Sequence, residues 1–489
     1  MFGLGSSAPR VAVRAARQLR RAASSTTEAP LARTALHSLH KELGGKLVPF
    51  AGYELPVQFP TGVLAEHLHA RKPADAALLF DVGEGTKAAR ARRACAGAAR
   101  AVRARARAPQ HWYARHRKRA PPAFSRAPSR PRSRPPLSLT RHARARSRCG
   151  AAAGHMGQLL WRGRDRARFL ETVCVADVQA LKEGSAALTV VTTASGGVLD
   201  DSILSNSGNG VHYMVLNGAT KAGDMAHFDA QLAAFRAANA GADVAYEYLP
   251  TQNLVALQGP AASAVLARLV DGGAAAGEAV AKLSFMSGRL RVSVAGVPCS
   301  VTRCGYTGED GYEVGMAAEH AETVARALLA DARVLPAGLG CRDSLRLEAG
   351  LCLYGHDMDT SITPNEASLM WVIPKSRRDL ASPRANFLGA KAILGQLAAK
   401  SWAKRRVGLS VQGAPAREGA RIFARGGAEP VGTVTSGTFS PVLKAPIAMG
   451  YVQTALMADG TALDVEVRGK RVPAVVTKMP FVPTRYYRG

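Results

Sequence analysis

The densest polar cluster of this chain is VTRCGYTGEDGYEV at residues 301–314, followed further along by CRDSLRLEAG at residues 341–350. Together the two stretches hold three arginines, five carboxylates and two tyrosines among four glycines. Charge at this density is poor core material, so the cluster favours a site for a polar, planar ligand. Gly305, Gly308 and Gly311 predict a turn in which the backbone bends or lets another group approach closely.

Glu313 and Arg342 are the candidates for the two charged ends of one binding slot, and spacing alone leaves two interpretations open. In the first, the two side chains form a buried ion pair. In the second, Glu313 accepts paired N–H donors from the edge of a heterocycle while Arg342 donates to ring or carboxylate oxygens. Tyr306 and Trp371 supply flat surfaces, although an isolated aromatic side chain is more often part of a core.

A second candidate site follows a glycine turn, where GGVLDD at residues 196–201 places Asp200 and Asp201 at the start of a strand. Successive strand residues point to opposite faces, so we expect one acid to be solvated while the other enters a cleft. Turn and capping chemistry is the alternative role for both acids. A cleft aspartate would position or polarise an amine nucleophile, and its ionised form would offset developing positive charge.

The formal net charge of +29 over 489 residues would ordinarily indicate a nucleic-acid or membrane partner. Two segments carry most of it, because residues 1–27 hold five arginines, residues 85–150 hold twenty Lys and Arg, and neither contains an acid. The rest of the chain is close to neutral, which fits an ordinary soluble enzyme with no nucleic-acid or membrane partner. No apolar run reaches the roughly 18–20 residues that span a bilayer.

The seven cysteines are odd in number and include no Cys-x-x-Cys pair. This pattern disfavours a zinc or disulfide scaffold and predicts a reducing compartment. His67 and His69 lack a third ligand at a plausible spacing. We therefore interpret them as a surface pair and predict no metal site.

Residues 1–28 predict a mitochondrial transit peptide, because their arginines recur three and four residues apart and no acid precedes Glu28. A disordered basic tail is the alternative. Residues 83–153 are rich in Ala, Arg, Pro and Ser with very few aliphatic side chains, which predicts a disordered insertion. An RNA-binding tail and a retained intron are the other interpretations of this segment.

Strands and helices alternate through the middle of the chain without the glycine fingerprint of a parallel nucleotide-binding sheet, which predicts mixed α/β or α+β structure. Strands are expected over 198–204 and 211–216, and helices over 166–181 and 221–239. Beyond residue 405, short strands separated by turn residues predict a small C-terminal β-barrel.

The chain resembles the T-protein family, the aminomethyltransferases of the glycine cleavage system, in an ordered set of motifs. Each motif is weak alone, whereas the ordered set is specific, and it covers most of residues 31–489 outside the insertion. The motifs are GKLVPFAGYELPVQF at 45–59, LFDV at 79–82, GGVLDD at 196–201, LQGP at 257–260, TRCGYTGEDG at 302–311, RDSLRLEAGL at 342–351, GTVTSG at 432–437, AMGY at 448–451 and KMPFVPT at 478–484.

The resemblance implies an α+β, three-domain, cloverleaf-like folate-binding fold. Its two mixed α/β domains would lie within residues 31–380 and its C-terminal β-barrel-like domain at 395–489. The implied activity moves an aminomethyl group from the lipoyl arm of the H-protein to tetrahydrofolate, giving 5,10-methylenetetrahydrofolate, ammonia and dihydrolipoyl H-protein. A monomer in the mitochondrial matrix, with the lipoylated H-protein as partner, is therefore expected.

The alternative within the same fold is another tetrahydrofolate-dependent one-carbon transferase or a non-catalytic folate-binding protein. The latter group carries a Lys-Gly-Cys-Tyr-x-Gly-Gln-Glu motif, which is absent from this sequence.

Position within the motifs also implies roles for single residues. Asp201 matches the family's catalytic carboxylate, which orients the folate amines for attack. The residues that match folate or cleft contacts are Glu313, Arg342, Tyr486, Tyr306, Asn217 and Met156. The chain departs from the family after Val82, where members continue Phe-Asp-Val directly into Ser-His-Met. The insertion at 83–153 therefore interrupts a motif close to the expected cleft residue Met156.

Overall fold

The computed structural model describes residues 31–72, 75–82 and 156–489. The predicted transit peptide at 1–28 and the predicted insertion at 83–153 lie outside the described residues.

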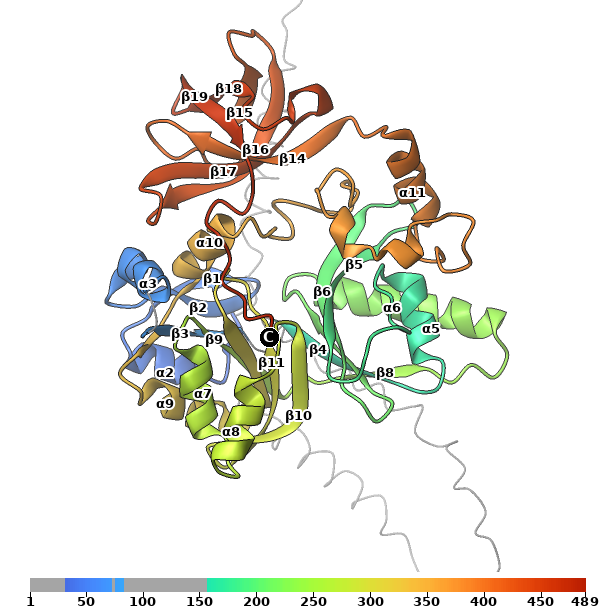
Figure 1. The fold of residues 1–489 in the computed structure, drawn as a ribbon, viewed down its shortest axis with the longest axis vertical. Helices are drawn as coiled ribbons and strands as arrows, with labels where there is room; N and C mark the ends of the chain where they lie inside the picture. The colour runs from blue at the N-terminus through green and yellow to red at the C-terminus, as the bar shows by residue number, and fades with distance from the viewer. Residues whose placement is uncertain (1–30, 73–74, 83–155) are drawn as a thin grey trace, which may run out of the picture. The chain divides into compact units, whose positions relative to one another are not determined.

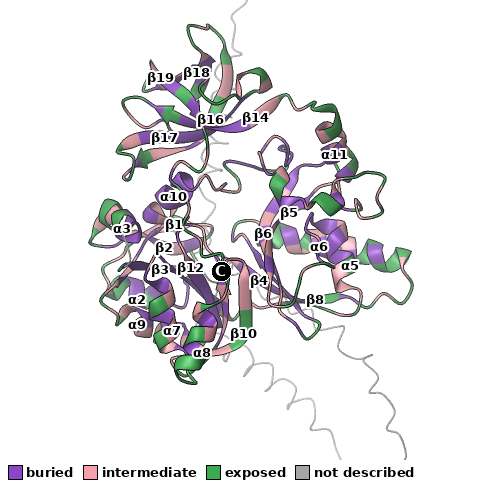
Figure 2. Cartoon of the chain, in the orientation of Figure 1, coloured by how far each residue is buried: buried purple, intermediate pink, exposed green. Residues whose placement is uncertain are grey.

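A six-stranded mixed sheet forms the first structural layer (Figure 1). Among its described strands, only the two at one end, residues 77–81 and 334–336, pair in parallel. In spatial order the strands are β10 (Ser287–Val294), β11 (Val297–Arg303), β12 (Gly311–Ala317), β9 (Gln252–Gln258), β3 (Ala77–Asp81) and β13 (Val334–Pro336). Helices cover one face and share its apolar core: α2 (His37–Glu42), α7 (Ala262–Leu269), α8 (Ala274–Ala281) and α9 (Ala321–Leu329). Figure 2 shows the central strand β12 buried along almost its whole length.

A five-stranded antiparallel sheet forms the second layer. Its order is β5 (Ala186–Thr192), β6 (Val198–Asn206), β7 (His212–Leu216), β4 (Gly157–Arg162) and β8 (Ala245–Tyr248). Helices α5 (Arg166–Val173) and α6 (Lys221–Ala238) pack on it around the buried Trp161. The Trp161 ring lies 5.4 Å from that of Phe169 and 5.3 Å from that of Phe228, so aromatic packing joins both helices to the sheet.

The helix expected over 166–181 ends early, at Val173, and this prediction is wrong in its second half. Cys174 adopts an extended conformation and bridges to Val191 on β5. The Arg377 guanidinium donates to the carbonyl oxygen of Glu171 at 2.6 Å and to that of Cys174 at 2.9 Å. Because a distant arginine satisfies these carbonyls, the chain can leave the helix without unpaired backbone groups.

The C-terminal part is a closed six-stranded barrel, as predicted. Its strands are, around the barrel, β14 (Lys404–Val411), β17 (Ala445–Gln453), β16 (Pro430–Ser440), β15 (Arg421–Ala424), β18 (Ala462–Val467) and β19 (Lys470–Thr477). Val434, Leu409 and Leu463 are among the side chains that fill it. The α+β fold with two sheet-and-helix regions and a terminal barrel is therefore confirmed.

The remaining elements belong to neither of these two sheets nor to the barrel. They are β1 (Lys46–Phe50), β2 (Tyr53–Gln58), α3 (Gly62–Ala70), α10 (Leu339–Glu348), α11 (Ala390–Ala399) and the short 3-10 segments Ala318–His320, Met370–Val372, Lys375–Arg377 and Thr454–Leu456.

The two sheets share an apolar cluster that positions the candidate site. It draws Phe80 and Leu254 from the first sheet, Tyr213 from the second, and Cys341 from α10. Met156 packs against this cluster from the residue before β4. The site residues described next come from strands and turns that border this cluster.

Candidate functional site

The glycine turn after β11 is built around the buried Gln258. Its Nε2 donates to the Cys304 carbonyl at 2.9 Å. A Cβ at Gly305 would lie 1.9 Å from Oε1 of Gln258, and one at Gly311 would lie 2.4 Å from its Nε2. Gly308 has a φ of +76°, which favours glycine. The prediction of a bend with close approach is confirmed, and the approaching group is a side chain of the protein itself.

Most charges of the opening cluster are committed to partners within the protein. Each of these pairs joins elements that are distant in the sequence or closes a turn, which identifies it as structural. The pairs are Arg303–Asp310 (Nε to Oδ1, 2.8 Å), Arg71–Glu309 (2.5 Å), Arg71–Glu348 (3.0 Å) and Arg346–Asp357 (2.6 Å).

Arg342 and Glu313 differ from these pairs, because no direct ion pair joins them in the part of the chain that the structure describes. The Arg342 guanidinium lies over the Tyr306 ring, with Cζ 4.9 Å from the ring centroid. Glu313 is buried in mid-strand and interacts with the Cys304 thiol. Burial raises the pKa of Glu313, while the Arg342 charge and the Cys304 hydrogen bond act against that rise.

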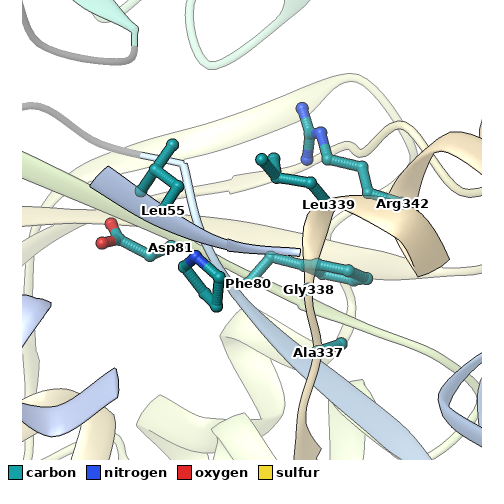
Figure 3. A pocket seen from close by; sticks show the side chains of 8 residues that line it. Leu55, Phe80, Asp81, Ala337, Gly338, Leu339 and Arg342 are labelled. Atoms are coloured by element: carbon teal, nitrogen blue, oxygen red, sulfur yellow. The ribbon is translucent and has the colours of Figure 1, made fainter. Parts of the chain in front are cut away.

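A pocket lies beside Arg342, and Figure 3 shows this side chain reaching from the first turn of α10. Asp81, at the end of β3, lines the same pocket. Its Oδ2 is hydrogen-bonded to Nε2 of His40 at 3.0 Å. The full lining is Leu55, Pro56, Phe80, Asp81, Ala337, Gly338, Leu339 and Arg342. The lining is mostly apolar, with the Asp81 carboxylate and the Arg342 guanidinium as its two charged groups.

Asn217, directly after β7, brings Asp200 and Asp201 to one point. Its Nδ2 donates to Oδ1 of Asp200 at 2.9 Å and to Oδ1 of Asp201 at 3.0 Å. Its backbone N–H donates to Oδ2 of Asp200 at 3.1 Å. Asp201 is half-buried and Asp200 is fully buried. The two acids therefore alternate in burial as expected of neighbouring strand residues, but both carboxyls bind the same Asn217 amide.

Asp201 is poised to exchange a proton near neutral pH. Burial, with the nearby charge of Asp200, raises the pKa of Asp201 to about 7, and the Asn217 hydrogen bond limits this rise. Such a carboxyl can serve as a base or as an anionic anchor under physiological conditions.

Tyr306 connects the aspartate to the arginine. Its hydroxyl donates to the carbonyl of Cys352, and burial raises its pKa. The charges of Asp201 and Arg342 both act on this hydroxyl, so both groups lie near Tyr306. The predicted residues Asp201, Asn217, Tyr306, Arg342 and Glu313 are thus brought into one neighbourhood.

Tyr486 reaches this neighbourhood along the C-terminal tail. The tail is held where the Arg485 N–H donates to the Gly308 carbonyl at 2.8 Å, and Figure 1 shows the C-terminus beside β11. The Tyr486 ring stacks on Phe285 with centroids 4.0 Å apart. Burial raises the pKa of Tyr486 to about 12, and Cys304 is among the groups acting on it. Tyr486 therefore lies next to the glycine turn, directly after the residue whose N–H binds Gly308.

Two residues of this neighbourhood escaped the sequence analysis. Cys304 lies within the TRCGYTGEDG motif, and its contact with Glu313 follows from the pairing of β11 with β12, where Thr302 faces Glu313. Asp224 resembles any acid in the first turn of a helix, where the dipole favours it. Nothing in its sequence context signals that it is buried next to Asp200.

His67 and His69 are both buried, so their interpretation as a surface pair is wrong. His67 contacts Ser344 Oγ at 2.7 Å and Glu348 at 3.0 Å, while His69 contacts the Arg333 carbonyl at 2.8 Å. Within the described ranges, no group of three or more His, Cys, Asp or Glu could hold a metal ion. None of the helices in these ranges is long and apolar enough to cross a membrane.

Residues 100–377 match the family model described as the GCVT N-terminal domain, and residues 404–483 match the glycine cleavage T-protein C-terminal barrel domain. A mitochondrial aminomethyltransferase from Dictyostelium discoideum is 38% identical over 462 residues, covering 93% of this chain and 94% of that protein. The chain belongs to the T-protein family of aminomethyltransferases. A mitochondrial relative from Gallus gallus is 40% identical over 470 residues, covering 96% of each chain.

The crystal structure of the glycine cleavage system aminomethyltransferase T from Bartonella henselae superposes on this T-protein with a TM-score of 0.70. The two are 32% identical, and the match covers 94% of this chain and 99% of the other. The predicted fold, enzyme class and mitochondrial location are confirmed by these relatives. The alternative of a non-catalytic folate-binding protein is not favoured by them.

Proposed function

We propose that this T-protein, acting as a monomer in the mitochondrial matrix, moves an aminomethyl group from the lipoyl arm of the H-protein to tetrahydrofolate. The carbon–sulfur and carbon–amine bonds of the aminomethyl group break, and two carbon–nitrogen bonds to the folate form. The two protons displaced from the folate nitrogens balance the reaction, one on the carrier thiol and one on ammonia. Tetrahydrofolate supplies the pair of amines that receives the one-carbon unit.

The observation that carries this proposal is the set of polar groups left without internal ion pairs. In the described chain, Glu313 and Arg342 lie in one neighbourhood yet form no direct ion pair with each other, unlike their neighbours in the sequence. A carboxylate can accept two N–H donors from a pterin-like edge, and a guanidinium can donate to its oxygens. The Tyr306 face beside Arg342 offers a stacking surface. This donor and acceptor set fits a folate ring.

Asp201 is the residue that we assign to the chemistry. Asp201 lies on strand β6, and the Asn217 side-chain amide donates to its Oδ1 at 3.0 Å. Above a pH of about 7 the carboxyl is ionised, since that is the value to which burial raises its pKa. The anion would orient a folate N–H and offset the positive charge that develops on the attacking nitrogen. Alignment of the two reactants would supply much of the rest of the rate.

The test is tetrahydrofolate-dependent release of ammonia from aminomethyl-lipoyl H-protein, comparing the unmodified enzyme with Asp201→Ala. We expect turnover to fall by roughly 10²–10⁴-fold, the usual range for loss of a proton-transfer group. Folate affinity, measured by equilibrium titration, should change little. Unchanged turnover in Asp201→Ala would remove this carboxyl from the mechanism.

A further inference from the structure

Asp224 is a buried acid for which the reaction described above has no role. It lies in the first turn of α6 and is 1% exposed. Neither of its carboxyl oxygens has a hydrogen-bond partner of ordinary geometry among the described residues, although the Thr220 hydroxyl lies close enough to oppose the rise in its pKa. The Thr220 hydroxyl, one turn earlier, is directed to the Asn217 carbonyl at 3.2 Å. A carboxylate in this position would be costly, because burial without a donor penalises the charged form.

The group that Asp224 does meet is the carboxyl of Asp200. Asp200 is fully buried and accepts from Asn217 on both of its oxygens, at 2.9 and 3.1 Å. Two carboxyls in contact inside a protein cannot both ionise, whereas one proton held between them gives each a hydrogen-bond partner. One proton held by either acid is therefore enough to give the two buried carboxyls a hydrogen bond to each other.

Asp201 and Tyr354 also act on this pair. Asp201 follows on β6, and Tyr354 approaches from the segment after α10, with its hydroxyl donating to the Val198 carbonyl at 3.2 Å. The Lys221 ammonium, at the start of α6, lies over the Tyr53 ring at 5.9 Å. The charge of Asp200 acts in turn on Asp201, the next residue of the same strand.

We propose that Asp200 and Asp224 share one proton at neutral pH and that this singly charged pair positions Asn217, and through it the catalytic Asp201. Two carboxyl acceptors fix the Asn217 side chain with its NH₂ group toward the acids. The shared charge also sets how readily Asp201 ionises. Asp224 is a positioning residue, since it acts through Asp200 and Asn217. The inference rests on the proposed function of Asp201.

Two isosteric variants move the charge of the pair in opposite directions. Asp224→Asn keeps an N–H donor for Asp200 but confines the negative charge to Asp200, close to Asp201. Asp200→Asn confines the charge to Asp224, which lies beyond Asp200 in the order Asp201, Asp200, Asp224. We expect the acid limb of the kcat/KM profile for ammonia release to move up by about half a pH unit in the first variant and down in the second.

The matched control is Asp229→Asn, one turn further along α6, where the carboxylate accepts from the Tyr246 hydroxyl at 2.9 Å. Its acid limb should coincide with that of the unmodified enzyme. A merely structural role for Asp224 would lower stability without moving the limb. Coincident limbs in all the variants, or shifts of the same sign in Asp224→Asn and Asp200→Asn, would overturn the proposal.

A measurement on the unmodified protein remains decisive if a variant fails to fold. Aspartate carboxyl-carbon NMR should show one aspartate that is still protonated at pH 8, above the midpoint of Asp201. Residues 1–30 and 83–155 contain no aspartate, so every aspartate signal arises from the described structure. A spectrum in which every aspartate is ionised at pH 8 would refute the shared proton. This readout needs no activity, so it separates the inference from the role of Asp201, which Asp201→Ala tests.

Discussion

Two charge networks lie beside the same glycine turn, and they differ in how their charges are paired. Around Arg71, each acid is matched by a cation or a donor, and the network joins α3, α10, the turn and the barrel. Around Arg342, the cation lies over a tyrosine ring and the nearby acid forms no direct pair with it. The charges of the first network bind one another, whereas those of the second remain available to bind a ligand. Charge density alone does not mark a site; unmatched buried charge does.

Arg71→Met is the substitution expected to have the largest effect on folding. It leaves Glu309 and Glu348 buried without this cation, although Arg485 still approaches Glu309 at 3.2 Å. Breaking one side of a buried ion pair costs about 3–5 kcal/mol. Denaturant unfolding measures the loss. The control is Arg326→Met, because Arg326 pairs with Glu42 and Glu322 on the surface, where solvent screens the charges and the loss should be much smaller. Equal losses in the two variants would contradict the distinction.

Arg342→Met should have the converse effect, weakening ligand binding while sparing the fold. The methionine can still cover the Tyr306 ring, and no internal ion pair is lost among the described residues. Charged hydrogen bonds contribute about 1.5–3 kcal/mol, so we expect folate affinity to fall by roughly 10–100-fold. Unfolding should change by less than about 1 kcal/mol. A variant that is as unstable as Arg71→Met and binds folate normally would show that Arg342 belongs to the structural network.

The raised pKa of Asp201 predicts a smaller effect, in which stability depends on pH. The folded state holds this proton up to a pH of about 7, whereas an unfolded aspartate loses it near its ordinary value of about 4. Between these values the native state binds more protons, so unfolding free energy falls as pH rises. Asp201→Asn removes this loss. The variant should melt higher than the unmodified enzyme at pH 8 and show no such advantage near pH 4. A constant difference in melting temperature across that range would exclude the titration of Asp201.

The sequence predicted the glycine turn and the polarity of the site because glycine geometry and unusual charge are local signals. It could not decide whether Glu313 and Arg342 pair, because that depends on how β11, β12 and α10 come together. The early end of α5 was missed for the same reason, since Arg377 lies about two hundred residues away. The role of Asp201 came from the family resemblance, and its convergence with Asp200 on Asn217 appears only in the folded chain.

The most direct test is a crystal structure of this protein with tetrahydrofolate bound. The unmatched charges around Arg342 predict that the folate ring edge lies within hydrogen-bond distance of the Glu313 carboxyl, beside the Tyr306 face. They also predict that a folate amine faces the Asp201 carboxyl that Asn217 holds. Folate bound elsewhere, with Glu313 and Arg342 drawn into a direct ion pair, would show that these charges serve the fold and would contradict the assignment of the site.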